Sequence, residues 1–465
     1  MADSFDIVVL GGGMGGYVAA IRAVQLGKSV ALVEKDKLGG TCLHWGCIPT
    51  KALLRTAELF HDAGNSADQG VRVSGVELDW PAANLRKQKI VDQLHKGVQY
   101  LMKKNKIEVV SGCGTLEDST TLRVEGTGTP RTLTAGKVIL ATGSVPRSLP
   151  GVEIDGKRVI NSDHALSLDA VPASAVIIGA GAIGVEFASM WHDCGSDVTL
   201  VEALPRVTPL EDPEVSQTIA RSFTRRGIKV ITGARIDLKS IKAGASAVSM
   251  KYEAEEGPAE LKADVLLMAV GRSAVTEGFG LEKTGVKVER GFVKVDADLR
   301  TDDPDIFAVG DVVGGYLLAH VASHEGIHAV EVIAGEQTEA LDYNHMPRCT
   351  YSRPQVASVG LTEEQAREAG VEVKVGRFPF SALGRAMINN DTEGFVKVVA
   401  DAGTGEILGT HMVGHNVTDL IAEPALGQLL EGTAWEMGIS VHAHPSLSEA
   451  IGEAALAVDG RAIHV

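Results

Sequence analysis

The chain is poor in cysteine, and this scarcity excludes a fold held together by disulfides. Its 465 residues contain only five cysteines, whereas small secreted domains use cysteine densely. No metal-ligand spacing involves these cysteines, so we expect no metal site. We expect Cys113, Cys194 and Cys349, which are isolated in the sequence, to be buried or unreactive.

Signals for membranes and nucleic acids are also missing. No run of eighteen apolar residues is present, so no membrane span is expected. The first residues, MADSFDIVVLGGG, lack the basic region and long apolar run of a signal peptide. The net charge of −16 argues against nucleic acid or anionic membrane as a partner. We expect a cytoplasmic protein, since in that compartment a structural disulfide is rare and a catalytic one is normal.

The length and the glycine content indicate several α/β domains. A chain of 465 residues is too long for one core and predicts two to four domains. Apolar residues make up 45% of the chain, which is enough for sizeable cores. The 53 glycines are typical of α/β units with tight phosphate-binding loops.

A complete dinucleotide-binding fingerprint lies near the N-terminus. An apolar run at 7–10 is followed by a glycine loop, a helix-like segment and a second apolar run at 30–33. The loop glycines are Gly11, Gly13 and Gly16. Glu34 ends the second run. Glycines let the backbone approach a pyrophosphate, and the acid accepts a hydrogen bond from a ribose hydroxyl.

The same unit occurs a second time. Apolar runs at 176–178 and 198–201 flank another glycine loop and end at Glu202. The loop glycines are Gly179, Gly181 and Gly184. The first glycine and the acid are 23 residues apart in both copies, so the sequence predicts two bound dinucleotides. Glu202 favours NAD, because a carboxylate repels a 2′-phosphate, although the nearby Arg206 leaves NADP as an alternative.

Two cysteines follow the first fingerprint directly. Cys42 and Cys47 are five residues apart, a rise of about 7.5 Å on a regular helix, while a disulfide needs Cα atoms within about 6.8 Å. The pair can therefore close only where the chain leaves the helix, and Gly46 allows that departure. Pro49 suits a first helical turn, which places Cys47 near a helix N-terminus where a thiolate is stabilised. The alternative is two small core residues that lie close by chance.

The string from Gly39 to Lys51, GGTCLHWGCIPTK, resembles the redox-active disulfide signature of the flavin-dependent pyridine nucleotide-disulfide oxidoreductases. It is most similar to the branch that oxidises dihydrolipoyl groups, whose usual string is GGTCLNxGCIPSK, and it departs at His44 and Thr50. The resemblance implies a redox disulfide between Cys42 and Cys47. It also implies FAD at the first fingerprint and NAD at the second, with Cys42 as the interchange thiol and Cys47 nearest the flavin.

Further motifs extend the resemblance. The segment 301–311 resembles the second FAD motif of the family, which implies that Asp311 binds the ribityl chain of the flavin. The segment 138–144 resembles the crossover out of the first flavin segment. The flavin-contacting residues implied there are Thr142, Gly143 and Ser144. Around Gly271, assigned to the NAD site, the chain returns to the flavin domain.

A charged pair beside the flavin is also implied. In the family, a lysine and a glutamate at the positions of Lys51 and Glu186 pair where hydride from the nicotinamide arrives. Lys51 is therefore assigned to catalysis and to FAD binding. Either residue could instead be a solvated surface charge.

These assignments give a domain order and a fold class. We expect an FAD domain at 1–145 and 273–345, an inserted NAD domain at 146–272 and a dimerisation domain at 346–465. The fold class is α/β, with two Rossmann-like domains and a C-terminal α+β domain. A long amphipathic helix is predicted over 79–105. The segment 351–360 resembles the start of the dimerisation domain of the family, which implies a homodimer.

An acid–base pair lies near the C-terminus. The segment 441–449 resembles the H-P-T-x-x-E motif of the family, with Ser446 in place of threonine. That match makes His444 the general base and Glu449 its orienting carboxylate, and it implies that the histidine reaches the disulfide of the other subunit. Imidazole titrates near working pH, and a carboxylate fixes its tautomer. His442 is the other candidate in this segment.

The expected activity is oxidation of a dihydrolipoyl group on an acyltransferase or other carrier protein, with reduction of NAD, in a 2-oxo acid dehydrogenase complex or a glycine cleavage system. Rivals within the family are glutathione reductase, which would prefer NADP arginines, and mercuric reductase, which carries a C-terminal cysteine pair that is missing from 461–465. A flavin transhydrogenase lacks the cysteine pair found here. A non-enzymatic flavin scaffold would not explain why both thiols, the base and its carboxylate occur together.

Overall fold

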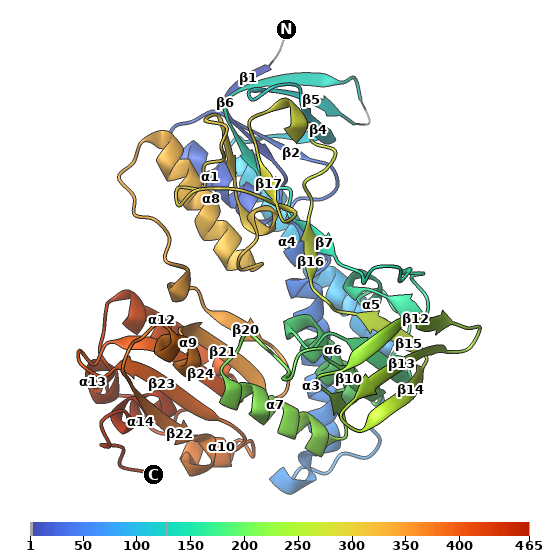
Figure 1. Ribbon diagram of the computed structural model, residues 1–465, viewed down its shortest axis with the longest axis vertical. Helices are drawn as coiled ribbons and strands as arrows, with labels where there is room; N and C mark the ends of the chain where they lie inside the picture. The colour runs from blue at the N-terminus through green and yellow to red at the C-terminus, as the bar shows by residue number, and fades with distance from the viewer. Residues whose placement is uncertain (1–2, 127, 465) are drawn as a thin grey trace. The chain divides into compact units, whose positions relative to one another are not determined.

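The computed structural model describes residues 3–126 and 128–464, and these form two compact units (Figure 1). The first unit contains the chain up to Ala52, Ala82–Arg147 and Arg272–Leu341. The second contains Leu53–Pro81, Ser148–Gly271 and the chain from Asp342. The predicted α/β class is confirmed, with a mainly parallel sheet in the first unit, and with one parallel sheet and two antiparallel sheets in the second. The four-segment division into domains stays a prediction.

A seven-stranded sheet forms the centre of the first unit. Its parallel strands are β3 (Glu108–Ser111), β2 (Val30–Glu34), β1 (Asp3–Leu10), β6 (Arg131–Leu140) and β19 (Ile306–Ala308). β4 (Cys113–Leu116) and β5 (Thr121–Glu125) continue it in antiparallel order. The four residues 7–10 are all buried, which explains their continuous apolar run, because a parallel sheet is covered on both faces.

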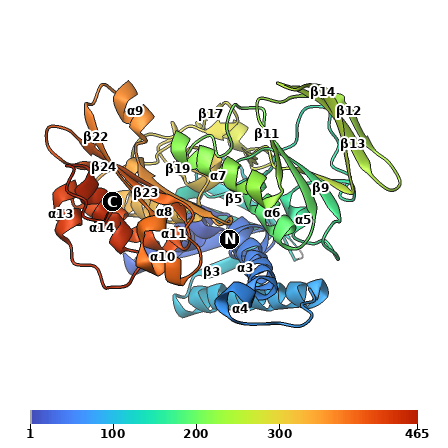
Figure 2. The ribbon, with the colours of Figure 1, turned by 90° about the horizontal axis from the view of Figure 1, so that it is seen from below.

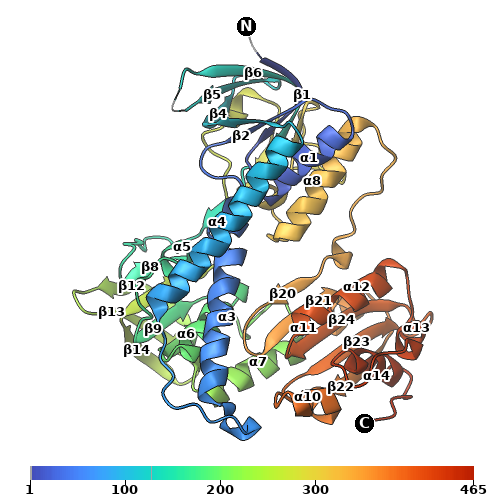
Figure 3. The ribbon, with the colours of Figure 1, turned by 180° about the vertical axis from the view of Figure 1, so that it is seen from behind.

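Helices α1 (Met14–Gln25) and α8 (Ala319–Ala334) pack closely together in this unit (Figure 3). A Cβ added at Gly326 would lie 2.5 Å from the Gly15 carbonyl oxygen, so only glycine permits this approach. The predicted long helix is confirmed as α4 (Trp80–Lys104). Its inner face buries Val91, Val98 and Met102, whereas Leu94 is 43% exposed.

The second unit contains a parallel sheet of β11 (Lys229–Ile231), β10 (Asp197–Val201), β9 (Ser174–Ile178), β15 (Val265–Met268) and β8 (Val159–Ile160). Helices α6 (Ala182–Asp193) and α7 (Pro213–Arg226) accompany it. A three-stranded antiparallel sheet follows, formed by β12 (Arg235–Ala243), β13 (Val248–Ala254) and β14 (Gly257–Ala263).

An antiparallel sheet forms the C-terminal part of the second unit. Its order is β20 (Arg348–Thr350), β21 (Gln355–Gly360), β24 (Ile407–Gly414), β23 (Phe395–Asp401) and β22 (Val373–Pro379). Helix α14 (Glu449–Ala457) packs on β22 and β23 (Figure 2). None of the helices that the structure describes has the length and apolar character needed for a membrane crossing.

Candidate functional site

The two glycine loops are close conformational copies of each other. Gly11 and Gly179 open them with φ of 111° and 99°, a region that favours glycine. A Cβ at Gly16 would lie 1.8 Å from the Gly11 oxygen, and one at Gly184 would lie 1.9 Å from the Gly179 oxygen. Each loop therefore turns so tightly that its last glycine touches its first.

The acids that end β2 and β10 also match. Glu34 Oε2 accepts a hydrogen bond from the Gly12 amide at 2.7 Å, and Glu202 Oε2 accepts one from the Ala180 amide at 2.6 Å. The second oxygen of Glu202 accepts from the Leu204 amide at 2.8 Å. These bonds fix both carboxylates at the rim of their loops, where a ribose hydroxyl could be bound.

Both loops end in a helix start that suits an anion. α1 begins after Gly13 and α6 after Gly181, and each of these residues has an extended backbone. Among the described residues, no side chain caps either helix and no acid occupies either first turn. Uncapped amides and the helix dipole are what a pyrophosphate requires, so the residues present fit FAD and NAD.

Asp311, in the short helix Gly310–Val313, lies in a polar network of the first unit. Ser144 Oγ donates to Asp311, while Arg272 Nε donates to Ser144 Oγ at 2.6 Å and lies 3.6 Å from the Asp311 carboxylate. Thr142 Oγ1 donates to the Val275 carbonyl at 2.7 Å. Arg272 was not identified from the sequence as a residue of this site. It fixes the acid expected to bind the ribityl chain.

The cysteine pair lies across a helix break, as expected. Cys42 belongs to α2 (Gly40–His44), and Cys47 is the first residue of α3 (Cys47–Gly64). Both are thiols here, with a hydrogen bond between them. Gly46 does not need a left-handed φ; a Cβ there would lie 3.1 Å from the Thr41 oxygen and 3.6 Å from the Cys42 Cα. The absence of a side chain at Gly46 therefore lets the chain pass close to the backbone of Thr41 and Cys42.

The surroundings of Cys42 act on the ionisation of its thiol. The hydrogen bond with Cys47 raises the pKa of Cys42, burial raises it further, and the charge of Lys51 opposes both. Cys47 is the first residue of α3, and a helix N-terminus stabilises an anion.

Two histidines hold the redox segment. His44 Nε2 and His95 Nδ1 each lie 2.9 Å from the Leu38 carbonyl oxygen, and the two rings are 5.0 Å apart. Burial is the main cause that lowers the pKa of His44 below its ordinary value. Thr50 Oγ1 donates to the Gly46 oxygen at 2.6 Å. Both departures from the usual family string thus fill structural positions.

Lys51 and Glu186 belong to different compact units. In its own unit, Glu186 is 5% exposed and its Oε1 accepts from the Tyr351 amide at 2.9 Å. The charge of Lys51 opposes the rise in the pKa of Cys42 that its hydrogen bond and burial cause. Their pairing stays a prediction.

The two histidines of the C-terminal segment, His442 and His444, have different surroundings. His444 is 81% exposed, and its Nδ1 lies 2.9 Å from Glu449 Oε1. Glu449 Oε2 accepts from the Ser446 amide at 2.8 Å. His442 is 10% exposed and lies 2.6 Å from Glu423. Only His444 presents its second ring nitrogen to solvent, as a general base must.

The three isolated cysteines differ from one another. Cys113 is exposed on β4, the strand at the edge of its sheet, so of the two expected alternatives it is not buried, and its lack of reactivity stays a prediction. Burial raises the pKa of Cys194 to about 12, which leaves it unreactive.

Two further residues concern the second nucleotide site. Arg206, which kept NADP as an alternative to NAD, lies 3.1 Å from Glu364. Gly271, assigned to the NAD site, has a φ of 103°.

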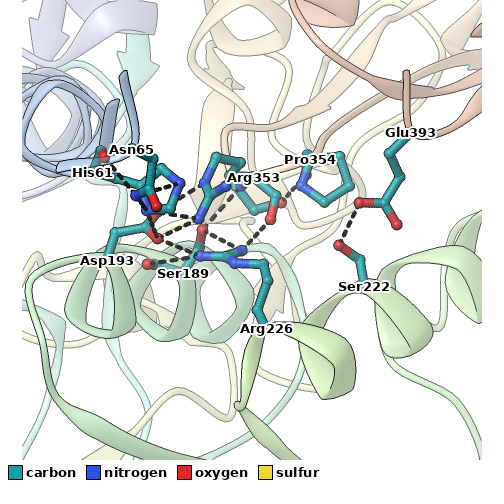
Figure 4. Close-up of polar contacts among 10 residues, drawn as sticks. His61, Asn65, Ser189, Asp193, Ser222, Arg226, Arg353, Pro354 and Glu393 are labelled. Atoms are coloured by element: carbon teal, nitrogen blue, oxygen red, sulfur yellow. Dashed lines mark hydrogen bonds and ion pairs between the residues drawn. The ribbon is translucent and has the colours of Figure 1, made fainter. Parts of the chain in front are cut away.

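An ion cluster around the buried carboxylate of Asp193 anchors the far end of α6 (Figure 4). Asp193 accepts from Arg226 Nη2 at 2.8 Å and from Arg353 Nη2 at 2.6 Å. Ser189 Oγ accepts from the Arg353 amide at 2.9 Å, and His61 Nδ1 lies 3.7 Å from Asp193. The cluster joins α6 to α3, α7 and the segment before β21, so it fixes the helix that carries Gly184.

Comparison with known proteins agrees with this geometry. Residues 5–326 match the family described as pyridine nucleotide-disulphide oxidoreductase, and residues 346–455 match its dimerisation domain. The chain is 48% identical to a dihydrolipoyl dehydrogenase of Bacillus subtilis and 45% identical to one of Zymomonas mobilis, with 100% of each chain covered.

Solved structures show the same similarity. LpdA from Mycobacterium tuberculosis has a TM-score of 0.90 at 27% identity, with 98% of this chain and 99% of that one covered. The flavoprotein disulfide reductase RclA from Escherichia coli has a TM-score of 0.85 at 29% identity, with 97% and 99% covered. Members of this group use FAD and NAD. The chain is a flavoprotein disulfide oxidoreductase and belongs to the pyridine nucleotide-disulphide oxidoreductase family.

Proposed function

We propose that this chain oxidises protein-bound dihydrolipoyl groups to lipoyl groups and reduces NAD to NADH. The observation that carries the proposal is the Cys42–Cys47 pair, hydrogen-bonded at the start of α3 and directly after the first glycine loop. Full-length relatives with the name dihydrolipoyl dehydrogenase, at 45% and 48% identity, support it.

The thiol chemistry is an exchange of one disulfide for another. One thiolate of the substrate attacks the Cys42 sulfur of the oxidised enzyme, which breaks the Cys42–Cys47 bond, forms a mixed disulfide and leaves a thiolate on Cys47. The second thiolate of the substrate then attacks the other substrate sulfur, the one bonded to Cys42 in the mixed disulfide. This closes the lipoyl ring and releases Cys42 as a thiolate. The substrate has lost two electrons, the cysteine pair has gained them, and both substrate protons have gone to bases.

His444 is the base that takes the first of these protons. Its Nδ1 faces Glu449, so the carboxylate fixes the tautomer and stabilises the imidazolium, while Nε2 is left to accept the thiol proton. We assign the base to the neighbouring subunit of a homodimer, in keeping with the dimerisation domain at 346–455.

The cofactor residues are assigned as follows. FAD, when bound, supplies the two-electron acceptor between the cysteine pair and NAD. Its proposed contacts are Gly11, Gly13, Gly16, Glu34, Lys51, Thr142, Gly143, Ser144 and Asp311. Those of NAD are Gly179, Gly181, Gly184, Glu202 and Gly271, with Glu186 beside the nicotinamide.

The partner is a lipoyl-bearing acyltransferase or carrier protein of a 2-oxo acid dehydrogenase complex or of glycine cleavage. We place the enzyme in the cytoplasm, because a disulfide that opens and closes in each cycle suits a compartment where other thiols stay reduced.

A substrate comparison tests the proposal. The purified, FAD-loaded protein should reduce NAD with dihydrolipoamide far faster than it reduces glutathione disulfide or Hg²⁺ with NADPH. A higher kcat/KM with either of the last two substrates would assign the chain to a different branch of the family.

A further inference from the structure

Helix α4 is basic in a chain that is otherwise acidic. Its 25 residues contain six lysines and arginines but one aspartate, a net charge of +5, whereas the whole chain carries −16. Three of these cations, Lys89, Lys96 and Lys103, follow one another at intervals of seven residues. We call these three lysines the basic stripe.

The basic stripe lies on one face of the helix. Seven residues make nearly two turns, so its members stand above one another about 10.5 Å apart. All three are exposed, while the opposite face buries Val91 and Val98. These lysines therefore point to solvent as a row about 21 Å long.

No carboxylate of the described chain forms an ion pair with any member of the basic stripe. The one acid of the helix, Asp92, accepts instead from Gln88 Nε2 at 2.8 Å. Two other cations of this unit do form ion pairs: Lys137 lies 2.6 Å from Asp305, and Arg131 lies 2.7 Å from Glu108. The positive charges of the stripe thus have no ion-pair partner within the part of the chain that the structure describes.

Helix α4 is attached to the redox segment within the first unit (Figure 3). His95, the neighbour of Lys96, hydrogen-bonds the Leu38 oxygen and contacts the ring of His44, two residues from Cys42. Arg86 Nη1 donates to the Ala52 oxygen at 3.2 Å, five residues after Cys47. The helix that carries the basic stripe therefore contacts the segment that carries both thiols, through His95 and Arg86.

Exposed aromatic side chains accompany the charges. Tyr100 lies between Lys96 and Lys103 in the sequence and is 63% exposed, and Trp45, between the two cysteines, is 38% exposed. Lys37 Nζ lies 5.5 Å from the centre of the Trp45 ring. Tyrosine and tryptophan are enriched among residues that anchor protein interfaces.

We propose that the basic stripe docks an acidic protein domain that carries the dihydrolipoyl group, and so brings its dithiol to the redox segment. The inference rests on the proposed function, whose substrate it specifies. A carrier domain must bind and leave in every cycle, and charge complementarity raises the association rate more than the lifetime of a complex. The −16 charge of the chain disfavours long polyanions, whereas a small acidic domain can meet the stripe alone.

A charge-matched pair of variants tests the docking surface. The test variant combines Lys89→Glu, Lys96→Glu and Lys103→Glu. The control combines Lys239→Glu, Lys251→Glu and Lys262→Glu, which lie exposed on the sheet β12–β14 and change the net charge equally. Each protein is assayed with free dihydrolipoamide, with a purified lipoyl domain of net negative charge in its reduced form, and with that domain after its carboxylates are amidated.

The test variant should lose about 10-fold or more in kcat/KM for the acidic domain at low salt, and the loss should shrink as salt screens the charges. Free dihydrolipoamide and the amidated domain should react equally well with all three proteins, and the control should behave as wild type. If the triple glutamate variant does not fold, the same three positions changed to glutamine should show a smaller loss of the same kind.

Several results would overturn the docking surface. The test variant could keep an unchanged kcat/KM for the acidic domain, or the control could lose as much as the test variant. A change in the oligomeric state of the test variant, measured by light scattering, would assign the stripe to contact with a second copy of this chain. Tighter binding of duplex DNA than of the acidic domain would assign it to nucleic acid. If wild type fails with free dihydrolipoamide, the proposed function is wrong. In that case calorimetry on the same three proteins tests the docking surface separately. Weaker binding of the acidic domain by the test variant alone would support the surface, and equal binding by all three would overturn it.

Discussion

His444 Nδ1 lies 2.9 Å from Glu449 Oε1, while its ring is 81% exposed. Burial acts to raise the pKa of Glu449, but the Ser446 amide and His444 outweigh it, so the pKa lies below its ordinary value. The carboxylate is therefore ionised at neutral pH and holds the ring with the other nitrogen outward. The pair has the geometry of a base and its orienting group before any substrate is bound.

Replacing this base should separate the two half-reactions. His444→Gln should lower the oxidation of dihydrolipoamide by about 10²–10⁴-fold, because no base then takes the thiol proton. Reduction of bound flavin by NADH needs no such base and should change little. Stopped-flow absorbance measures both rates. Glu449→Gln should act in the same direction but less. His442→Gln should spare the thiol step, because His442 is paired with Glu423. Equal loss in both half-reactions would contradict the role of His444.

The close match between the two loops allows a paired test of which cofactor each one binds. Gly16→Ala should abolish retention of FAD, because its Cβ would lie 1.8 Å from the Gly11 oxygen. Gly184→Ala should keep FAD and raise KM for NAD, because its Cβ would lie 1.9 Å from the Gly179 oxygen. Gly97→Ala, where nothing lies within 4 Å, is the control. The measurements are the flavin content of the purified variants and their KM for NAD. Loss of FAD from Gly184→Ala with a raised KM for NAD in Gly16→Ala would exchange the two cofactor assignments.

Nucleotide preference should depend on Glu202 and not on Arg206. Glu202→Ala should narrow the preference for NAD over NADP by on the order of 1–3 kcal/mol, since a hydrogen bond and a repulsion are both lost. Arg206→Ala should leave the preference unchanged, because Arg206 is engaged by Glu364 at 3.1 Å. The measurement is the ratio of kcat/KM for the two nucleotides. Comparable values for wild type would show that Glu202 does not discriminate.

Asp193 should be worth more to stability than a surface ion pair. Asp193→Asn should lower the free energy of unfolding by about 3–5 kcal/mol, because two arginines are left without their buried partner. Asp305→Asn, which breaks the exposed pair with Lys137, should cost less than about 1 kcal/mol. Urea denaturation of both variants measures this. Similar losses in the two would show that the cluster in Figure 4 stabilises no more than a surface pair.

The effect of Asp193 should also depend on pH with a defined sign. Burial acts to raise its pKa, but Arg353 and Arg226 outweigh it, so the folded-state pKa lies below the ordinary value. Such a group stabilises fully above the pKa of the unfolded chain and loses that contribution as pH falls through the folded-state pKa. The difference between wild type and Asp193→Asn should stay constant from neutral pH to about pH 5 and narrow in stronger acid.

The parts of the site that the sequence predicted are those that depend on neighbours along the chain. The glycine loops, the acids that follow them and the break between Cys42 and Cys47 are each contained in short segments with their own periodicity. Arg272 could not be predicted in this way, because its partner Ser144 is 128 residues away. Asp193 and Arg353 are 160 residues apart, and no spacing indicates such a contact.

Two details show why local patterns also mislead. Cys113 is a small isolated residue, and nothing in the sequence places it on a strand near a sheet edge, where it is exposed. Gly46 was expected to provide backbone freedom, whereas its contribution is the space between Thr41 and Cys42. Burial and close approach are set by what the rest of the fold brings near, which one sequence segment does not contain.

The central claim is that electrons from a dihydrolipoyl dithiol pass through Cys42 and Cys47 to NAD. Its most direct test traps the thiols of the FAD-loaded enzyme with iodoacetamide under anaerobic conditions and locates the label by mass spectrometry. One equivalent of dihydrolipoamide should make Cys42, the interchange thiol, open to labelling, and NAD added before the trap should abolish that labelling while NADH forms. The same amount of NADH with no change in labelling at Cys42 would contradict the account.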